Sequence, residues 1–455
     1  MPGSPRRGRV LIGLMFFPRG GSAHVTRALA RALPAHGWDV SVVSGSVRDR
    51  GGHADARRFF AGLDVHAMDY TGAVTAADPL AHDPPMHPSF EDREGAADRV
   101  FGRVDDAAHE RLVDAWSALF ERAGAARADV IHLNHLTPMH AAAARVAPGV
   151  PVVTHVHGTE LLMLEEIDAG PPAGWEHAQA WARRLREWAA ASAQLVLLSD
   201  TQEERVEEIM GVPHDHCTVI PNGFDPDIFD RREVDRVAHW RRHLVEEPQG
   251  WRPGGEPGSV AYTEDDLEAF AGHHPTLLYV GRYTKVKRLG LLIRAYARAQ
   301  PGFSTRAPLV LLGGYPGEWE GEHPLEAIEA TGVRDVFLAG WHDHDVLPAC
   351  FGAADAVVLP SVREQFGQPA IAVNAHGPRH IVDDPETGWL VEPDDEAALA
   401  GALLGAANDP EERRRRGARA RAVVRGRYSW PALAGRMAEV YDHLKNADSA
   451  QDVRK

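Results

Sequence analysis

Short apolar-rich runs recur along the first half of the chain, and amphipathic stretches separate them. The runs lie at residues 9–17, 39–45, 129–135, 150–157 and 194–199. Between the first two runs, residues 23–37 place apolar side chains three and four positions apart, which is typical of a helix, and they end at a glycine. Apolar runs are typical of parallel strands that helices cover on both faces. The pattern therefore predicts a doubly wound α/β domain.

The same alternation returns in the second half of the chain, with runs at 275–281, 308–314, 335–341, 355–361 and 387–393. Because 455 residues are too many for one compact core, we expect two domains. We predict four segments: an N-terminal Rossmann-like domain at 1–220, a hinge and variable linker at 221–274, a C-terminal Rossmann-like domain at 275–428, and at 429–455 a helix that packs back on the N-terminal domain, followed by a polar tail.

Three stretches depart from this alternation. Residues 71–99 are rich in Pro and Asp, and predict an exposed excursion. Residues 231–274 are polar with a Gly- and Pro-rich centre, which favours a linker or insertion. The basic run at 413–427 has helical spacing and predicts a solvated helix face.

Net charge, cysteine count and the lengths of the apolar runs argue against several classes of protein. Sixty-five acidic against 49 basic residues give a net charge of −16, which argues against a nucleic-acid partner. The two cysteines cannot build a disulfide framework, and a reducing, cytoplasmic setting fits them. Basic residues precede the first apolar run as in a signal peptide, but Pro18 and glycines follow at once, so a buried first strand is favoured. No run reaches the ~20 apolar residues of a membrane span, and peripheral membrane contact stays open.

Residues that could bind a ligand follow the ends of several predicted strands, which is where doubly wound sheets bind ligands. "FFPRGGS" offers backbone N–H groups at a helix N-terminus, at Gly20 and Gly21. Arg282 and Lys287 follow another strand, where two cations can neutralise a diphosphate. His157 in "VTHVHGTE" and Glu364 in "LPSVREQFG" stand at two further strand ends. Together these residues predict a pocket for a sugar diphosphate between two domains.

Seven motifs, in order, carry a family resemblance: "GGSAHVTRALARAL", "VVTHVHG", "VIPNGFDPDIF", "YVGRYTKVKR", "LLGG", "VLPSVREQFG" and "GPRHIVDDPETGWLVEPDD". They span nearly the whole chain and resemble the retaining glycosyltransferases of family four, bacterial enzymes included, which have the GT-B fold. The resemblance implies a C-terminal domain that holds a nucleotide-sugar donor and an N-terminal domain that mainly holds the acceptor. It implies no cofactor and no metal ion.

The resemblance also implies residue roles. Arg282 and Lys287 would stabilise the departing diphosphate, an electrostatic effect that usually dominates such catalysis. His157 would lie near the transferred sugar, and Glu364 would hold its hydroxyls. The implied donor-binding residues are Gly20, Gly21, Gly313, Gly314, Phe366 and Gly367. The family often has Gly after the lysine, whereas Arg288 stands here.

One part of the family pattern is missing. The family places a second Glu eight positions after the first, where it binds the ribose, but that position is Ala372, and no acidic residue occurs between Glu364 and Asp383. Residues 369–378 favour a strand over a helix, so the helix that carries this Glu is expected to be deleted after Gln368. Loss of the carboxylate would lower donor affinity about 10²-fold or more.

Other interpretations remain open at the level of sequence. His132, His135 and His140, or His342 and His344, suggest a metal site, but none matches a known ligand spacing. The chain is predicted to be an active glycosyltransferase, an inactive shell of one, or an epimerase or phosphorylase on the same plan. Its partners would be a nucleotide-sugar donor and an unknown acceptor, and the oligomeric state is not predicted.

Overall fold

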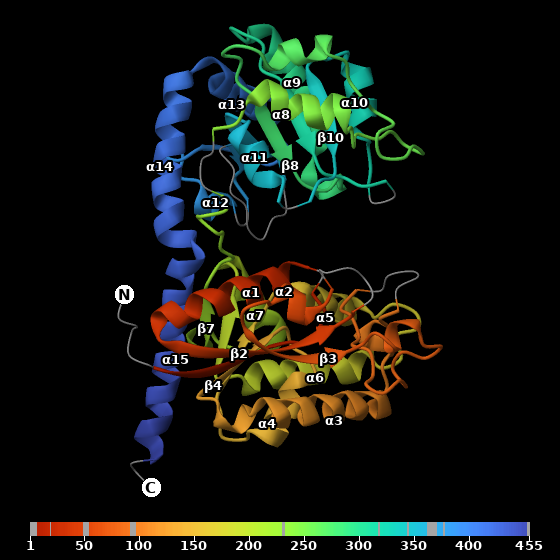
Figure 1. Ribbon diagram of the computed structural model, residues 1–455, viewed down its shortest axis with the longest axis vertical. Coiled ribbons are helices and arrows are strands. Elements are labelled where there is room, and N and C mark those ends of the chain that lie inside the picture. Colours follow the sequence, from red (N-terminus) through yellow and green to blue (C-terminus); the bar gives the residue numbers. More distant parts are fainter. Residues whose placement is uncertain are drawn as a thin grey trace. The chain divides into compact units, whose positions relative to one another are not determined.

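The structure is a computed structural model that describes residues 7–18, 20–48, 54–91, 97–229, 233–316, 319–343, 345–361, 371–375 and 378–452. It contains two compact units (Figure 1). The first unit comprises Met1–Phe224 and Arg427–Lys455, and the second comprises Asp225–Gly426. Each unit has one parallel sheet with helices on its faces, so the predicted α/β class with two doubly wound domains is confirmed.

The sheet of the first unit has the order β3-β2-β1-β4-β5-β6-β7. Its strands are β1 (Gly8–Leu14), β2 (Trp38–Ser46), β3 (Asp64–Asp69), β4 (Val130–Asn134), β5 (Val152–His155), β6 (Gln194–Leu197) and β7 (Cys217–Val219). Its helices are α1 (Gly21–Ala32), α2 (Ala56–Phe59), α3 (Asp106–Ala123), α4 (Met139–Val146), α5 (Thr159–Ala169), α6 (Ala178–Ala191) and α7 (Thr201–Met210), with α15 (Trp430–Asp452) from the end of the chain. Successive residues of β1 are buried, as a strand covered on both faces requires.

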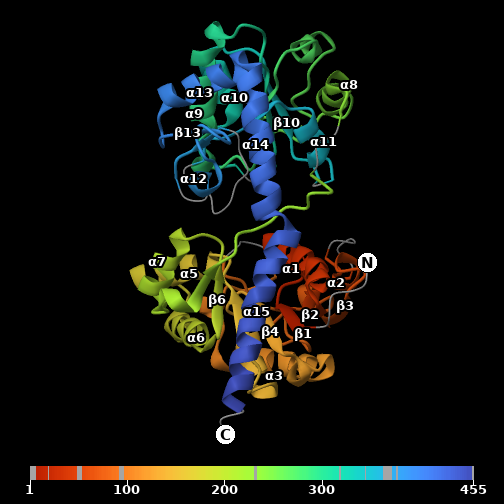
Figure 2. The same ribbon diagram turned by 90° about the vertical axis from the view of Figure 1, so that its left-hand side faces the viewer.

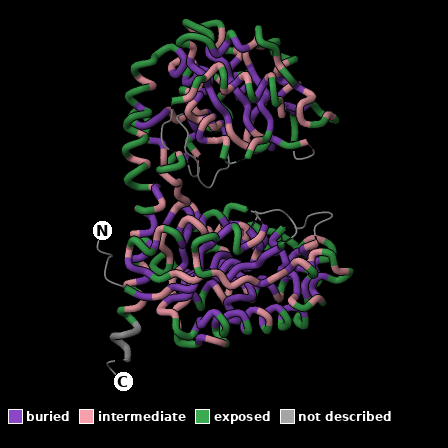
Figure 3. Tube along the Cα trace, viewed as in Figure 1, coloured by how far each residue is buried: buried purple, intermediate pink, exposed green. Residues whose placement is uncertain are grey.

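The sheet of the second unit has the order β10-β9-β8-β11-β12-β13. Its strands are β8 (Leu277–Val280), β9 (Leu309–Leu312), β10 (Val336–Gly340), β11 (Ala356–Leu359), β12 (Ile371–Val373) and β13 (Trp389–Val391). Its helices are α8 (Arg236–Arg241), α9 (Leu289–Ala299), α10 (Pro324–Thr331), α11 (Leu347–Gly352), α12 (Pro378–Ile381), α13 (Glu396–Asn408) and α14 (Pro410–Tyr428). The predicted strand in "PAIAV" is therefore present as β12. Buried residues follow the strands in both units (Figure 3).

The last helix, α15, lies against the first unit (Figure 2). Leu433, Met437 and Tyr441 are fully buried in one apolar cluster with residues of β1 and α1. A charged contact fastens the same helix at the surface, since Arg7 and Asp442 are 2.5 Å apart. These contacts make residues 430–447 part of the core of the first unit.

Two stretches that composition marked as exposed or linking are packed into the cores. Within 71–91, Met86, His87 and Phe90 are buried, and Phe90 lies against Phe101 and His135. Within 233–274, Trp240 and Trp251 are almost fully buried in the second unit. Their polar, Pro-rich neighbours dominate the composition, so these apolar side chains were not recognised as core residues.

Among the described residues, no helix is long and apolar enough to cross a membrane.

The strand orders fix where ligands are expected. In the first sheet the chain runs from β1 outward to β3 and then returns to the other side of β1 with β4. In the second sheet it runs from β8 outward to β10 and returns beside β8 with β11. The order reverses between β1 and β4 and between β8 and β11, and doubly wound sheets bind ligands at the carboxyl ends of the strands there.

Candidate functional site

A cationic turn follows β8, at the reversal point of the second sheet. The side chain of Arg282 is exposed and has no hydrogen bond or ion pair with any residue in the described ranges, and the backbone carbonyl oxygen of Arg282 accepts a 2.8 Å hydrogen bond from the hydroxyl of Tyr279. Lys287 is the last residue of the short 3₁₀ helix Lys285–Lys287. Its backbone N–H donates to the carbonyl oxygen of Thr284 over 2.9 Å. Both cations that the sequence predicted therefore belong to one turn at the expected strand end.

Glycines bring the ends of three neighbouring strands together beside this turn. The N–H of Gly313, after β9, donates to the carbonyl oxygen of Gly340, the last residue of β10, over 2.6 Å. The N–H of Gly281, after β8, donates to the carbonyl oxygen of Leu312 over 3.0 Å. Gly313 and Gly314 both have positive φ, 113° and 70°. The predicted pair of glycines thus belongs to an edge of bare backbone next to Arg282.

Gly313→Ala tests this edge. A Cβ at this position would lie 2.2 Å from the Gly281 carbonyl oxygen, and φ is in the left-handed range, so we expect the free energy of unfolding to fall by about 2–4 kcal/mol. The matched control is Gly401→Ala in α13, where no atom lies within 4 Å of the new Cβ and helix propensity favours alanine. Urea unfolding compares the two variants, and a Gly313→Ala protein as stable as the wild type would refute the steric argument.

Arg288, where the family often has glycine, has φ of 53° and is the N-cap of α9. Its guanidinium donates two hydrogen bonds to the Asp394 carboxylate, at 2.7 and 3.2 Å. The left-handed backbone gives a physical reason for glycine at this place. Here a bidentate ion pair offsets the cost of a side chain in that conformation.

The end of β11 reaches the same turn. Ser361 is buried, and its hydroxyl donates to the carbonyl oxygen of Val286 over 3.1 Å. The predicted residues Glu364, Phe366 and Gly367 follow directly in the chain but lie outside the described residues. The described part of the chain thus contacts the cationic turn at Ser361, and the roles of the three residues that follow stay predictions.

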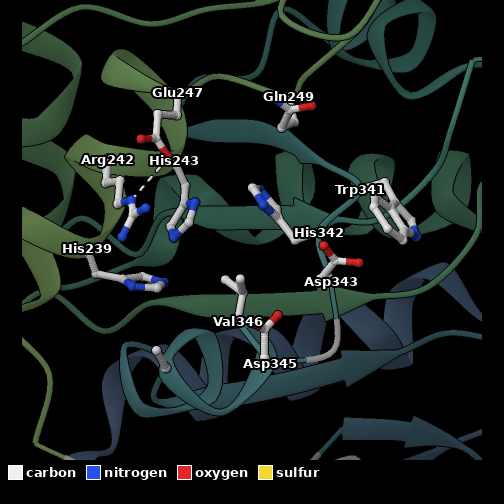
Figure 4. Close-up of a pocket in the computed structure, with 11 residues that line it drawn as sticks. His239, Arg242, His243, Glu247, Gln249, Trp341, His342, Asp343, Asp345 and Val346 are labelled. Carbon is white, nitrogen blue, oxygen red and sulfur yellow. Dashed lines mark hydrogen bonds and ion pairs between the residues drawn. The ribbon is translucent and has the colours of Figure 1, made fainter. Parts of the chain in front are cut away.

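A cavity of about 540 Å³ opens at the end of β10 (Figure 4). Its walls include His239 and His243, from α8 and the turn after it, and His342, which follows β10. The rings of His243 and His342 meet edge to face with centroids 4.6 Å apart. Burial lowers the pKa of His239 and of His243 to about 4, so both are neutral at pH 7.

Polar groups and one aromatic face complete this cavity. Trp341 is half exposed, and Asp343 stands beside it in the wall. Arg242 and Glu247 form an ion pair 3.1 Å long on the opposite side. Among the described residues, the buried Nδ1 of His243 has no hydrogen-bond partner. The cavity can therefore stack a planar group on Trp341 and meet its edge with neutral imidazole.

In the first unit, Gly20 and Gly21 open α1 directly after β1. Gly20 is the N-cap, no side chain caps the helix, and its first turn has no acidic residue. No described atom lies within 4 Å of a Cβ built on either glycine. The first turn of α1 thus has no side-chain cap and no acidic residue, and its N–H groups favour an anion; the role of Gly20 and Gly21 stays a prediction.

His157 stands two residues after β5 and is surrounded by polar groups from β4 and α5. Its Nε2 is 2.9 Å from Oδ1 of Asn134. Its ring stacks on that of His155, with centroids 4.6 Å apart, and contacts the tilted ring of His135, with centroids 4.5 Å apart. Burial, and next the neighbouring histidines, hold the pKa of His157 well below its usual range, so the ring is neutral at pH 7.

A buried carboxylate belongs to the same cluster of side chains. Nδ1 of His135 is 2.8 Å from Oε1 of Glu160, whose side chain is fully buried in the first turn of α5. Burial raises the pKa of Glu160, but the nearby His135 and its hydrogen bonds lower it more, and the carboxylate is ionised at pH 7. Sequence reasoning noticed His135 only as a metal candidate and did not single out Asn134 or Glu160. The available signal was a polar residue at the last position of β4, for Asn134, and an acidic residue in the first turn of the helix after β5, for Glu160.

The histidines do not gather as a metal centre in the described part of the chain, where no group of three His, Cys, Asp or Glu side chains has a geometry that could hold a metal ion. His344, one of the candidates, lies outside the described residues. The polar groups at the strand ends instead suit a ligand with hydroxyls and phosphates.

Residues 19–228 match the family described as Glycosyltransferase Family 4, and residues 264–423 match the one described as Glycosyl transferases group 1. The chain is a glycosyltransferase that combines these two domains. It is 26% identical over 441 residues to glycogen synthase of Mycobacterium tuberculosis, an alignment that covers 86% of the chain and 94% of the relative.

Solved structures confirm the predicted GT-B fold. Sucrose-phosphate synthase of Thermosynechococcus elongatus aligns with a TM-score of 0.61 and 19% identity, over 97% of this chain and 100% of that one. HepE of Anabaena, solved with UDP and glucose, aligns with a TM-score of 0.61 and 16% identity, over 94% of this chain and 98% of that one. The chain therefore shares the whole two-domain architecture of these structures.

Proposed function

We propose that this glycosyltransferase moves a sugar from a nucleoside-diphosphate sugar to an acceptor hydroxyl, with retention at the anomeric carbon and without a metal ion. The observation that carries the proposal is the cationic turn after β8, which presents Arg282 and Lys287 at the reversal point of the second sheet. Family membership and a structural relative solved with UDP and glucose support the same class of donor.

The donor diphosphate would lie on this turn. Arg282 and Lys287 would neutralise the leaving phosphates, and the bare backbone at Gly313 and Gly314 would let the diphosphate approach the strand ends closely. An exposed arginine without a partner among the described residues is free to take that role. We propose that Gly20 and Gly21 add the N–H groups of α1 to the phosphates.

The cavity at the end of β10 would hold the nucleobase. In a parallel sheet neighbouring strands are about 4.8 Å apart, so β10, two strands from β8, ends roughly 10 Å from the cationic turn. A nucleotide extends over a similar length from its diphosphate to its base. Trp341 would stack on the base, and the neutral His243 and His342 would meet its polar edge.

In this reaction the bond between the anomeric carbon and the phosphate oxygen breaks, and a bond from the same carbon to the acceptor oxygen forms on the same face of the sugar. The acceptor's proton passes to the departing phosphate. His157 would contact the transferred sugar, and Glu364 would hold its hydroxyls. Acceptor choice would lie in the loops at 46–100 and 159–175 of the first unit.

One observation favours an impaired form of the same enzyme as the second candidate. Only residues 360–370 connect the parallel neighbours β11 and β12. Parallel neighbours usually need a crossover of about a dozen residues or more, most often with a helix. Eleven residues are at the lower limit of such a crossover, and Ala372, where the family has its ribose-binding Glu, lies inside a strand; both support the proposed loss of the helix that carries this Glu. Donor binding would then depend on the cationic turn and the cavity.

Thermal unfolding with UDP, GDP or ADP at millimolar concentration tests donor binding. A nucleotide at 100 times its dissociation constant adds about 2.7 kcal/mol to the free energy of unfolding. We expect one of the three to raise the melting temperature of the wild type, and to do so less in Arg282→Ala. No shift with any nucleotide, on a protein that unfolds cooperatively, would favour the inactive shell.

A further inference from the structure

We infer that Asn134 is a positioning residue that fixes the proton of His157 on Nε2 and turns an unprotonated Nδ1 toward the substrate, so that His157 recognises a sugar hydroxyl and not a phosphate oxygen. The inference rests on the proposed function for the identity of the substrate. The orientation itself follows from hydrogen bonds within the first unit.

The amide of Asn134 can adopt only one orientation. One end of its side chain is 3.1 Å from the carbonyl oxygen of Gly13 in β1, and a carbonyl oxygen only accepts hydrogen bonds. That end must therefore be the NH₂ group, which leaves Oδ1 at the other end, 2.9 Å from Nε2 of His157. Since an amide oxygen also only accepts, Nε2 of His157 has to carry the hydrogen.

Burial makes this arrangement rigid. Asn134 is 1% exposed, and it pairs in register with His155 of β5, the strand that leads to His157. The His157 ring contacts the rings of His135 and His155. The other tautomer, with the proton on Nδ1, would place an unprotonated Nε2 against the Asn134 oxygen, which is two acceptors face to face in a buried site.

Nδ1 of His157 is then the atom left for a ligand. It makes no hydrogen bond to any residue in the described ranges, and the residue is only half-buried. An unprotonated Nδ1 accepts a hydrogen bond, so its partner must be a donor, which a sugar hydroxyl is and an ionised phosphate is not. The charged and titratable groups around the ring are His132, His135, His155 and Glu160, and the three histidines disfavour a proton on His157.

The first test is the tautomer itself, read from ¹⁵N–¹H correlation spectra of histidine-labelled protein at pH 7.5 without any ligand. We expect His157 as the pure Nε2–H tautomer in the wild type, and loss of this preference in Asn134→Leu, which removes the acceptor oxygen. A proton on Nδ1 in the wild type would overturn the inference. This readout does not depend on transfer activity, so failure of the proposed function would leave it unaffected.

The second test is kinetic and uses Asn134→Leu, which removes the acceptor. We expect kcat/KM for the donor sugar to fall about 10- to 100-fold, with perturbed His157 resonances. The matched control is Gln202→Leu, which removes another buried amide of the first unit, one that accepts from the N–H of Leu198 over 2.8 Å. The control should leave kcat/KM and the His157 resonances unchanged. Equal kinetic losses in both variants would reduce Asn134 to a structural role and overturn the inference.

Discussion

Replacing Arg282 by Ala is expected to lower the rate of sugar transfer about 10²–10³-fold, and Lys287→Ala about as much, with only small changes in stability. The reason is electrostatic, since charge develops on the departing diphosphate and these two cations follow β8, where it would lie. The two losses should combine to less than their product, because both cations act on one leaving group. Steady-state release of nucleoside diphosphate measures each variant.

The matched control for this pair is Arg298→Ala. Arg298 is exposed near the other end of α9, in the same unit. Its replacement by Ala removes one positive charge and leaves the turn after β8 unchanged. The control should transfer sugar at the wild-type rate. Wild-type rates in Arg282→Ala and Lys287→Ala would contradict the proposed donor site.

The first unit is expected to lose stability steeply in mild acid. Burial lowers the pKa of His140 to about 4 and that of His155 to about 3, and it holds those of His132 and His157 well below the usual range. Histidines in an unfolded chain have a pKa of about 6.5. Below that pH the unfolded chain therefore binds protons that these histidines do not bind in the folded unit. Stability is therefore complete above about pH 6.5 and falls as the pH drops from there toward 4, by about 2 kcal/mol for each such histidine at pH 5.

His155→Phe separates this effect from other acid effects. Both ring nitrogens of His155 are buried without a partner in the described part of the chain, so phenylalanine should be at least as stabilising at pH 7.5. The fall in the free energy of unfolding between pH 7.5 and 5 should shrink by about 2 kcal/mol. The exposed His216 in the same unit supplies the control His216→Phe, which should keep the full fall. Equal pH dependence in both variants would contradict the argument.

Sequence patterns were sufficient for the strands that are buried on both faces. Runs such as 277–280 and 309–312 are fully apolar, and they appear as β8 and β9. The edge strand β3 was not predicted, because most of its residues are half-buried and it includes polar side chains. The segment around Trp240 and Trp251 looked like a linker because the Gly- and Pro-rich stretch beside it dominates the composition.

The site was predictable where chemistry follows a strand in sequence and not where it depends on register. Arg282 and His157 could be identified because each stands just after its own strand. The contact of Asn134 with His157 depends on how β4 pairs with β5, and the contact of His243 with His342 depends on how the turn after α8 packs against the end of β10. Neither contact can be predicted from the local sequence around the residues that make it. The segment with Glu364 remains a sequence prediction.

The most direct test of the account is nucleoside-diphosphate release from UDP-, GDP- and ADP-glucose, each with and without a panel of simple sugars and inositol as acceptors. We expect release of one diphosphate above the background hydrolysis of its donor, stimulated by an acceptor, lost in Arg282→Ala and retained in Arg298→Ala. Release that is absent with every donor on folded protein, or that is unchanged in Arg282→Ala, would contradict it.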